Sequence, residues 1–291
     1  MQIDPLSIKT SELHAYLLGA VAPRPICFAS TINAEGQPNL SPFSFFNVFG
    51  SNPATLIFSP SRRVRDNTVK HTLENVMATR EVVINVVNYG MVQQASLASC
   101  EYPAGVNEFE KSGFTPVPSE KIKPFRVKES PVQIECIVKE IIITGQEGGA
   151  GNLVICEPVM LHINETILDA NGKIDPHKID LVARMGGDYY CRASGDAVFE
   201  VAKPNTKLGI GVDALPAAIR NSSILTGNNL GQLANVHELP FIDPAFHDDH
   251  LKNIIQYYSV TPDEMERELH LYAKQLLERG DVRAAWQVLL A

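Results

Sequence analysis

Short runs rich in valine, isoleucine and phenylalanine recur along the first two thirds of the chain, and proline, glycine, asparagine or serine bounds each run. This pattern is typical of β-strands. The runs cover residues 26–32, 40–46, 55–59, 82–87, 132–144 and 153–163. The last two are joined by a glycine-rich segment, 146–152, which predicts a hairpin turn between two long antiparallel strands. In the first of these two, Ile134, Cys136 and Val138 alternate with Glu135, Ile137 and Lys139, which predicts one wetter face.

Helical patterns are fewer in this part of the chain and cover residues 9–18, 67–78 and 91–99. Many strands and few helices predict a mainly β fold: an antiparallel barrel with peripheral helices packed on its outside. The sequence therefore favours one barrel domain over residues 1–195.

The pattern changes after about Ala193. Residues 204–240 contain several glycines and prolines and few periodic runs, which predicts an irregular segment on the surface that could extend an active-site rim. From Pro244 onward the pattern is helical. Thr261 and Pro262 form a helix start, Gly280 a stop, and a last helix is expected to run through Leu290. Residues 196–291 are thus interpreted as a C-terminal extension, irregular and then helical.

The charge of the chain narrows the function classes. It has 25 lysines and arginines against 33 aspartates and glutamates, a formal net charge of −8, and no long basic run, which argues against a nucleic-acid partner. No apolar run approaches the length that spans a membrane, so no membrane association is expected. The N-terminal residues do not resemble a secretory signal. A cytoplasmic location is the resulting expectation.

Metal and disulfide chemistry are not predicted. The five cysteines are scattered and never form a CxxC pair, which excludes the usual spacing of a zinc site or a disulfide framework. Residues 247–250 (HDDH) are metal ligands by type, but they lie in an acidic helical segment with no third partner in view. We interpret them as a solvated helix face.

Polar side chains interrupt the first two predicted strands. Hydroxyl and amide groups stand among apolar residues there, and a proline removes a backbone donor in mid-strand. Such breaks of local rules tend to mark ligand sites. The residues concerned are Ser30, Thr31, Asn39, Leu40, Ser41, Pro42, Ser44 and Asn47.

Five segments occur in a fixed order between residues 23 and 190: PRPICFAST (23–31), NLSPFSFFN (39–47), RDNTVKHTLEN (65–75), EYPAGVNEFEKSGF (101–114) and ARMGGDYY (183–190). Together they resemble the flavin reductase-like family of FMN-binding split barrels. The resemblance implies a Greek-key antiparallel barrel, the FMN-binding split β-barrel, followed by a helical extension.

The third segment offers a phosphate site. Its basic and polar residues lie before or within the first turns of a predicted helix, where free N–H groups and the helix dipole favour an anion. They are Arg65, Asn67, Thr68, Lys70 and Thr72. The resemblance singles out Lys70 and Thr72, although His71 stands where relatives often carry aspartate. The alternative is a solvated basic face on an ordinary helix start.

Two further segments concern the flavin ring. Arg24 lies between two prolines, and we expect it either to reach the flavin or to pair with a carboxylate across a subunit interface. The resemblance places the segment from Arg184 to Tyr189 at the incoming nicotinamide or at the flavin rim. In the alternative interpretation this segment is only a tight turn.

The resemblance implies an FMN-dependent oxidoreductase, a flavin reductase that takes hydride from NADH or NADPH. Hydride transfer to flavin N5 requires ring stacking and exclusion of water but no acid or base, so no catalytic side chain is predicted. The family usually covers its flavin with a second subunit, which implies a homodimer. Electrons would pass to free flavin, oxygen or a partner such as a monooxygenase. The alternatives are a flavoredoxin-like electron carrier and a scaffold protein that acts through its helical tail.

Overall fold

The computed structural model describes residues 1–204 and 207–291. The chain divides into two compact units, Met1–Phe199 and Glu200–Ala291. The sequence placed the boundary at residue 195, within a short 3₁₀ helix, Gly195–Ala197. Each unit is described here by itself.

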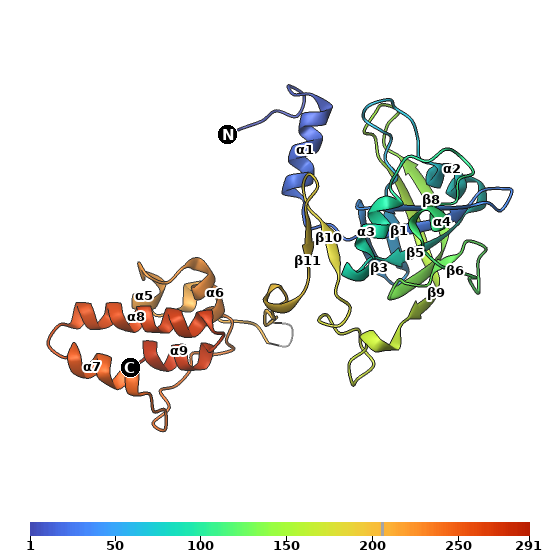
Figure 1. Cartoon of the computed structure of the whole chain (residues 1–291). Coiled ribbons are helices and arrows are strands. Elements are labelled where there is room, and N and C mark those ends of the chain that lie inside the picture. Colours follow the sequence, from blue (N-terminus) through green and yellow to red (C-terminus); the bar gives the residue numbers. More distant parts are fainter. Residues whose placement is uncertain (205–206) are drawn as a thin grey trace. The chain divides into compact units, whose positions relative to one another are not determined.

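The first unit is built on a seven-stranded sheet in which every strand pairing is antiparallel (Figure 1). Its strands are β1 (Cys27–Ile32), β2 (Pro38–Phe43), β3 (Phe46–Ser51), β4 (Ala54–Phe58), β5 (Glu81–Val86), β8 (Val132–Ile143) and β9 (Asn152–Ile163). They lie in the order β2-β1-β5-β8-β9-β4-β3. The two edge strands, β2 and β3, are neighbours in sequence, separated by Ser44 and Phe45 alone. The sheet therefore curls into a barrel that stays split between them.

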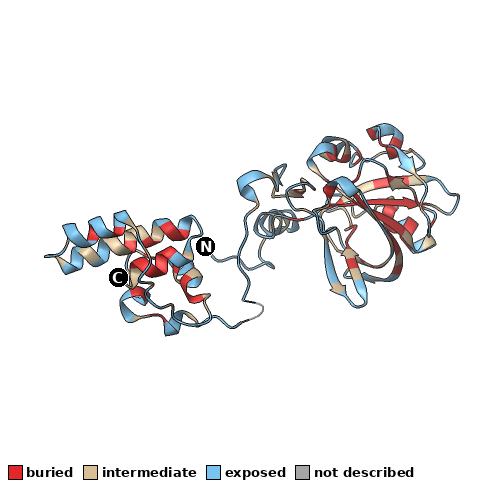
Figure 2. Cartoon of the chain, turned by 90° about the horizontal axis from the view of Figure 1, so that it is seen from below, coloured by how far each residue is buried: buried red, intermediate tan, exposed pale blue. Residues whose placement is uncertain are grey.

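Strand β1 is buried along its whole length because both of its faces are covered. Figure 2 shows that buried residues are concentrated on the strands of the sheet. Cys27 and Ala29 belong to the cluster inside the barrel. Phe28 points the other way and packs with Leu40 in a second cluster beneath the helices. This two-sided burial holds the polar residues of β1 and β2 in place between two apolar layers.

Short helices and two small hairpins complete the first unit. The helices are α1 (Thr10–Ala20), α2 (His71–Thr79), α3 (Val92–Leu97) and α4 (Glu108–Ser112), with 3₁₀ turns at Tyr89–Met91 and Glu165–Ile167. The hairpins pair β6 (Pro116–Val117) with β7 (Arg126–Val127), and β10 (Val182–Arg184) with β11 (Tyr190–Arg192).

Two predicted boundaries in this unit were wrong. Helix α2 begins at His71, not at residue 67, because Asn67 has a left-handed φ of 58° and Lys70 is extended. The run 40–46, predicted as one strand, is broken at Ser44 and Phe45, where the chain crosses from one edge of the sheet to the other. Strand β3 beyond residue 46 was not predicted.

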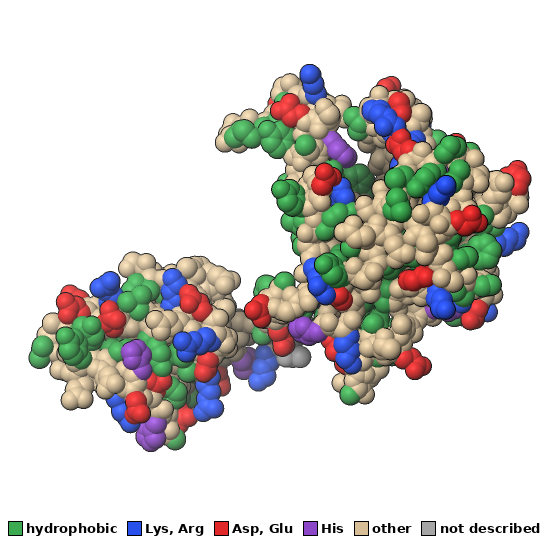
Figure 3. All heavy atoms as spheres, in the orientation of Figure 1, with side chains coloured by type: hydrophobic (Ala, Val, Ile, Leu, Met, Phe, Trp, Pro, Cys, Tyr) green, Lys and Arg blue, Asp and Glu red, His purple; other side chains and the backbone are tan. Residues whose placement is uncertain are grey.

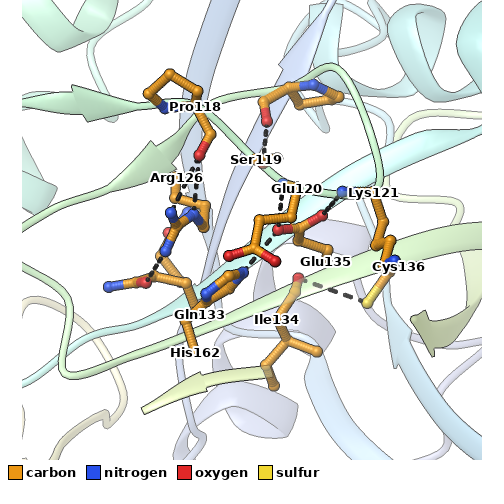
Figure 4. A network of polar contacts seen from close by, with 12 residues as sticks. Pro118, Ser119, Glu120, Lys121, Arg126, Gln133, Ile134, Glu135, Cys136 and His162 are labelled. Carbon is orange, nitrogen blue, oxygen red and sulfur yellow. Dashed lines mark hydrogen bonds and ion pairs between the residues drawn. The ribbon is translucent and has the colours of Figure 1, made fainter. Parts of the chain in front are cut away.

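The predicted wetter face of β8 was also wrong at one position. Glu135 is fully buried, because the loop before β7 folds over it. Its carboxylate accepts backbone N–H groups from Glu120 (2.9 Å) and Lys121 (2.7 Å) and lies 2.7 Å from Nε2 of His162 (Figure 4). These contacts offset the desolvation of the carboxylate, and its pKa is lowered.

The second unit is helical and has its own apolar core. Its elements are a 3₁₀ turn at Val212–Ala214 and helices α5 (Ala217–Arg220), α6 (Gly227–Ala234), α7 (Asp249–Tyr257), α8 (Pro262–Glu278) and α9 (Val282–Leu289). Trp286 is almost completely buried at its centre. The predicted helix start at Pro262 and the stop at Gly280, with φ of 80°, are confirmed.

The prediction of an irregular surface segment at 204–240, of which residues 205 and 206 lie outside the described residues, was wrong for two short helices and for the positions buried between them and the rest of the unit. This stretch contains α5 and α6, and Leu215, Ile219 and Leu233 are buried in the helical core. Its helices have at most eight residues, so their apolar positions do not repeat often enough to form a visible period. Part of the segment therefore belongs to the core of the second unit.

The surface has no large region of basic side chains on the face shown in Figure 3, in line with the absence of a long basic run in the sequence. On the face that Figure 3 shows, basic and acidic side chains are interspersed. In the described part of the chain, no helix has both the length and the apolar character that crossing a bilayer requires.

Candidate functional site

A small hollow lies between β2, the start of α2 and the loop that follows α3. Its volume is about 20 Å³, and we call it the Lys70 pocket. Its lining residues are Asn39, Ser41, Arg63, Lys70, His71, Thr72, Ala98, Cys100, Glu101, Tyr102 and Glu108. Four of these, Asn39, Ser41, Lys70 and Thr72, were predicted site residues.

A buried hydrogen-bond network shapes one wall of the pocket. Nδ2 of Asn39 donates to the hydroxyl oxygens of Thr72 (3.0 Å) and Thr31 (3.1 Å). Nδ2 of Asn75 also donates to Thr31, at 3.0 Å. Thr72 only accepts among the described contacts, so its own hydroxyl hydrogen remains available to a ligand in the pocket.

The two cations of the pocket differ in their surroundings. Arg63 is engaged: its Nε contacts Glu101 at 2.8 Å, and its Nη1 donates to Thr68 (2.6 Å) and to the carbonyl of Val69 (2.9 Å). Lys70 is half-buried, and among the described residues no carboxylate lies within 4.0 Å of its Nζ. Burial, followed by the charge of Arg63, lowers the pKa of Lys70. A bound anion would offset the repulsion by Arg63 and favour the charged form of Lys70.

The N-terminus of α2 adds to the preference for an anion. Lys70 is the N-cap residue, and its side chain makes no capping hydrogen bond. The first N–H groups of a helix lack intrahelical partners and carry the positive end of the dipole. With Lys70 and the Thr72 hydroxyl beside them, the Lys70 pocket has the donor set that suits one phosphate group.

Glu108 also lines the pocket, although no sequence pattern marks it as a site residue. It is buried, and its Oε2 accepts the backbone N–H of Leu40 at 3.0 Å. Desolvation raises its pKa, against the effects of that hydrogen bond and of His71 nearby. In the sequence, Glu108 reads as an ordinary first-turn acid after the N-cap Asn107. Its contact with Leu40, 68 residues away, leaves no local signal.

A wider hollow of about 230 Å³, here called the Ser44 cavity, lies beside the Lys70 pocket. Its lining is apolar on one side, with several hydroxyl groups and one arginine. The residues are Ile26, Pro42, Phe43, Ser44, Val92, Ala95, Ser96, Ser99, Arg184 and Tyr190.

Arg184 and Tyr190 face each other across the β10–β11 hairpin. Nη1 of Arg184 donates to the hydroxyl of Tyr190 at 2.7 Å, and the guanidinium carbon lies 4.8 Å from the ring centroid. Nη2 of Arg184 donates to the carbonyl of Gly187 at 2.9 Å. The cation is therefore held at the cavity by contacts within its own hairpin.

The two hollows adjoin along β2 and the end of α3. Ser41 and Ala98 line the Lys70 pocket, whereas their chain neighbours Pro42 and Ser99 line the Ser44 cavity. The linings of the two hollows are thus neighbours in the chain, and we refer to the two hollows together as the groove, with the Lys70 pocket as its narrow end and the Ser44 cavity as its wide end.

Several predicted site residues are not in this groove. Arg65 is exposed and pairs with Asp66 and Glu101. Asn67 forms the turn itself: its Oδ1 accepts from Nε of Arg62 at 2.6 Å. Part of the polar side chains in residues 65–75 therefore stabilise the turn before α2 and do not line the groove.

The remaining strand residues also lie elsewhere. Leu40 packs in the core beneath the helices, and Ser30 is buried with no hydrogen-bond partner for its Oγ among the described residues. Asn47 is exposed on β3, and its Oδ1 accepts the N–H of Val48. Tyr189 is 79% exposed and does not line the groove, whereas Tyr190 does.

Arg24 makes its described contacts within its own chain, including one from its Nε to the hydroxyl of Ser44 at 3.4 Å. It is buried, and its guanidinium donates to the carbonyls of Leu18 (2.6 Å), Val21 (2.7 Å) and Met185 (2.9 Å). It therefore ties the C-terminal end of α1 to the β10–β11 hairpin, because unsatisfied carbonyls at a helix end attract a cation.

The acidic and histidine side chains at 247–250 have structural contacts. Asp248 caps α7 by accepting the N–H of Leu251 and also accepts the hydroxyl of Tyr272 at 2.6 Å. His250 packs edge-on against the ring of Tyr272. Within residues 1–204 and 207–291, no three His, Cys, Asp or Glu side chains converge as a metal site requires.

Comparison with known proteins places the first unit in a family. The family described as Flavin reductase like domain matches residues 19–177. An uncharacterized protein from Aquifex aeolicus is 38% identical over 189 residues, which cover 65% of this chain and 94% of that protein.

Two solved structures are similar to this chain. Nitrilotriacetate monooxygenase component B from Bacillus cereus is 27% identical, with a TM-score of 0.64 and coverage of 69% of this chain and 98% of that one. A candidate flavin reductase with split barrel domain from Shewanella frigidimarina is 26% identical, with a TM-score of 0.59 and coverage of 70% and 99%. The fold predicted from the sequence, a split barrel with peripheral helices, is confirmed.

Proposed function

This chain belongs to the family of flavin reductase-like domains, and from that premise we propose that it binds FMN and oxidises NADH or NADPH. The observation that carries the proposal is the groove along β2. Its narrow end has the donors for one phosphate, and its wide end has the lining that a flavin ring requires.

The narrow end would hold the phosphate of FMN. Lys70 supplies positive charge, the Thr72 hydroxyl supplies a hydrogen, and the start of α2 supplies backbone N–H groups.

The wide end would hold the ring. Ile26, Pro42 and Val92 offer an apolar wall, and the Ser44 and Ser96 hydroxyls offer polar partners for the ring edge. Arg184 places a cation there, which favours negative charge on a reduced ring. FMN, when bound, supplies the N5 atom that accepts hydride from a nicotinamide. The residues of the chain have only to orient the two rings and exclude water.

A second copy of the chain is proposed to cover the ring. The Ser44 cavity, at about 230 Å³, is smaller than the roughly 300–1,000 Å³ of usual ligand pockets. Exposed apolar side chains follow the groove directly in the chain: Phe45 is 39% exposed, and Val48 and Phe49 on β3 are each 64% exposed. Burying them against a partner would enclose the site. Sedimentation should give a dimer, and a monomer that still binds FMN tightly would contradict this.

The electron acceptor is proposed to be a partner protein or free flavin. The similar Bacillus cereus protein is named as a monooxygenase component, which supports a monooxygenase as one such partner.

The deciding experiment is the absorbance spectrum of the purified full-length protein with FMN, before and after anaerobic NADH or NADPH. Bands near about 370 and 450 nm that bleach within seconds are expected of a flavin reductase. Bands that persist with both nucleotides would instead support an electron carrier. A protein that binds no flavin would refute the proposal and leave the helical unit as the functional part.

A further inference from the structure

The second unit contains a hollow that is larger than the Ser44 cavity. Its volume is about 460 Å³, within the roughly 300–1,000 Å³ of usual ligand pockets, and we call it the His270 cavity. It lies between α5, the turn that follows α5, and the first half of α8 (Figure 1). The family match ends at residue 177, so the resemblance assigns nothing to this cavity. The lining residues are Ala217, Ala218, Asn221, Ser222, Ser223, Ile224, Asp263, Glu266, Arg267 and His270.

His270 is the buried polar side chain of this cavity, with 6% of its surface exposed. Its Nδ1 lies 2.8 Å from Oγ of Ser222. That hydroxyl oxygen already accepts the backbone N–H groups of Ile224 and Leu225, each at 3.1 Å. Because both lone pairs of the oxygen are used, the hydroxyl hydrogen points at Nδ1, and the neutral imidazole carries its own hydrogen on Nε2.

The Nε2–H group of His270 is left for a ligand. It has no hydrogen-bond partner among the described residues, and it is not enclosed by the protein either. The only described side-chain atoms that are both enclosed and unpaired are Oγ of Ser30 and Oε1 of Gln232. Burial lowers the pKa of His270 against the opposite effect of Glu266, which keeps the ring neutral at pH 7. The cavity therefore presents one fixed donor to a carbonyl or carboxylate oxygen.

Three charged side chains of α8 line the same cavity, and none of them forms an ion pair within the described part of the chain. Asp263 and Arg267 are four residues apart, a spacing that often pairs such side chains on a helix. Here their charged atoms are more than 4.0 Å apart. Glu266 also has no basic partner within that distance. The cavity thus offers one cation and two carboxylates to a ligand.

We propose that the His270 cavity binds a free α-amino acid. The carboxylate of such a ligand would accept the Nε2–H of His270 and pair with Arg267, and its ammonium group would pair with Asp263 or Glu266. A simple anion would meet two carboxylates, and a simple cation would leave the donors of His270 and Arg267 unused.

The charge balance of the lining also predicts which amino acids bind best. Carboxylates outnumber the arginine, so a basic amino acid such as lysine should bind more tightly than an acidic one. Flavin binding in the first unit is not required for this site.

Trp286 allows the site to be followed in the full-length protein. It is the only tryptophan of the chain and is buried in the core of the second unit, so its fluorescence reports the thermal unfolding of this unit. The probes are L-lysine and L-glutamate, together with Nα-acetyl-L-lysine and L-lysine amide, which each lack one end charge. L-lysine should raise the unfolding midpoint of the flavin-free protein. Calorimetric titration should give L-lysine a Kd at least about fivefold lower than that of each other probe.

Substitutions separate the cavity from a general effect of charge. Arg267→Gln should weaken L-lysine binding about fivefold, and Glu266→Gln should remove most of the preference for L-lysine over L-glutamate. Glu264→Gln is the matched control, because Glu264 is an exposed acid of the same helix that does not line the cavity. It should change both affinities by less than about twofold. His270→Phe keeps a ring without the Nε2–H donor and should weaken L-lysine binding at least about tenfold.

Several outcomes would overturn the proposal. One is the absence of both a midpoint shift and a heat of binding with L-lysine at about 10 mM. Another is equal binding of the blocked probes and L-lysine, since the two end charges would then not be recognised. Equal effects of Glu264→Gln and Glu266→Gln would attribute the preference to the general charge of the unit and refute the cavity as its origin. Unchanged binding in a folded His270→Phe also refutes the site, and if that variant does not fold, Arg267→Gln and the blocked probes decide.

Discussion

Replacing Lys70 with methionine tests the anion end of the groove most directly. Methionine keeps an unbranched side chain of similar length and removes only the charge and the donor hydrogens. A hydrogen bond to a charged group contributes about 1.5–3 kcal/mol. Because Lys70 is half-buried and solvent screens part of the interaction, we expect the lower end of this range, roughly a tenfold weaker Kd for FMN.

The assay compares two ligands that differ only in the phosphate. Fluorescence titration of Lys70→Met should show the tenfold loss with FMN and a change of less than about twofold with riboflavin. Arg65→Ala is the control, since Arg65 is exposed, pairs with Asp66 and Glu101, and does not line the Lys70 pocket. It should alter FMN binding by less than about threefold.

Stability provides an independent check. Burial lowers the pKa of Lys70, which means that folding disfavours its charged form. The apo form of Lys70→Met should therefore unfold at the same temperature as wild type or higher. The reasoning is refuted if FMN and riboflavin lose affinity equally, or if Arg65→Ala weakens FMN binding as much as Lys70→Met does.

Three further predictions concern other parts of the first unit. Thr72→Val should weaken FMN binding roughly fivefold and lower the unfolding free energy by about 1–3 kcal/mol, because Asn39 loses a buried hydrogen-bond acceptor. Fluorescence titration measures the first effect and urea unfolding the second. Unchanged stability would contradict the hydrogen-bond network described around Asn39. Glu135→Gln should lower the unfolding free energy at pH 7 by roughly 2–4 kcal/mol. The pKa of Glu135 is lowered in the folded state, so its ionised carboxylate stabilises the fold above the ordinary pKa of 4.5, and this stabilisation is lost as the pH falls below that value. The unfolding free energy from urea titrations between pH 7 and 3.5 should therefore depend less on pH in the variant than in wild type. An equal pH dependence in both proteins would contradict the role given to Glu135. Tyr190→Ala should weaken flavin binding severalfold, about 1 kcal/mol of binding free energy, whereas Tyr189→Ala should not. Equal effects of the two substitutions would argue against the Ser44 cavity as the ring site.

The sequence could predict what local patterns encode. The valine- and isoleucine-rich runs located most strands, and the glycine-rich segment 146–152 does join β8 to β9. Pro262 and Gly280 marked a helix by its ends, because capping depends on residues within one turn. Helices α5 and α6 were not predicted because they are too short for their apolar positions to repeat with a recognisable helical period.

The candidate site was predictable only in part. Lys70, Thr72, Asn39 and Ser41 do meet around one pocket, although their side chains come from different elements. The neighbouring basic residues looked equivalent in sequence. The tertiary structure separated them, since Arg65 and Asn67 complete a turn and Lys70 faces the pocket.

By itself, the sequence determined the barrel strands, the polar break in the first two of them and the helical end of the chain. Only the tertiary structure decided that Glu108 lies against Leu40, that Glu135 is buried under a loop and that Tyr190, not Tyr189, faces the groove. The physical reason is that Tyr190 begins β11 and pairs with Arg184, whereas Tyr189 lies in the turn before it and donates its N–H to the carbonyl of Gly186. Contacts between residues far apart in the chain depend in the same way on register and packing, which no local pattern contains.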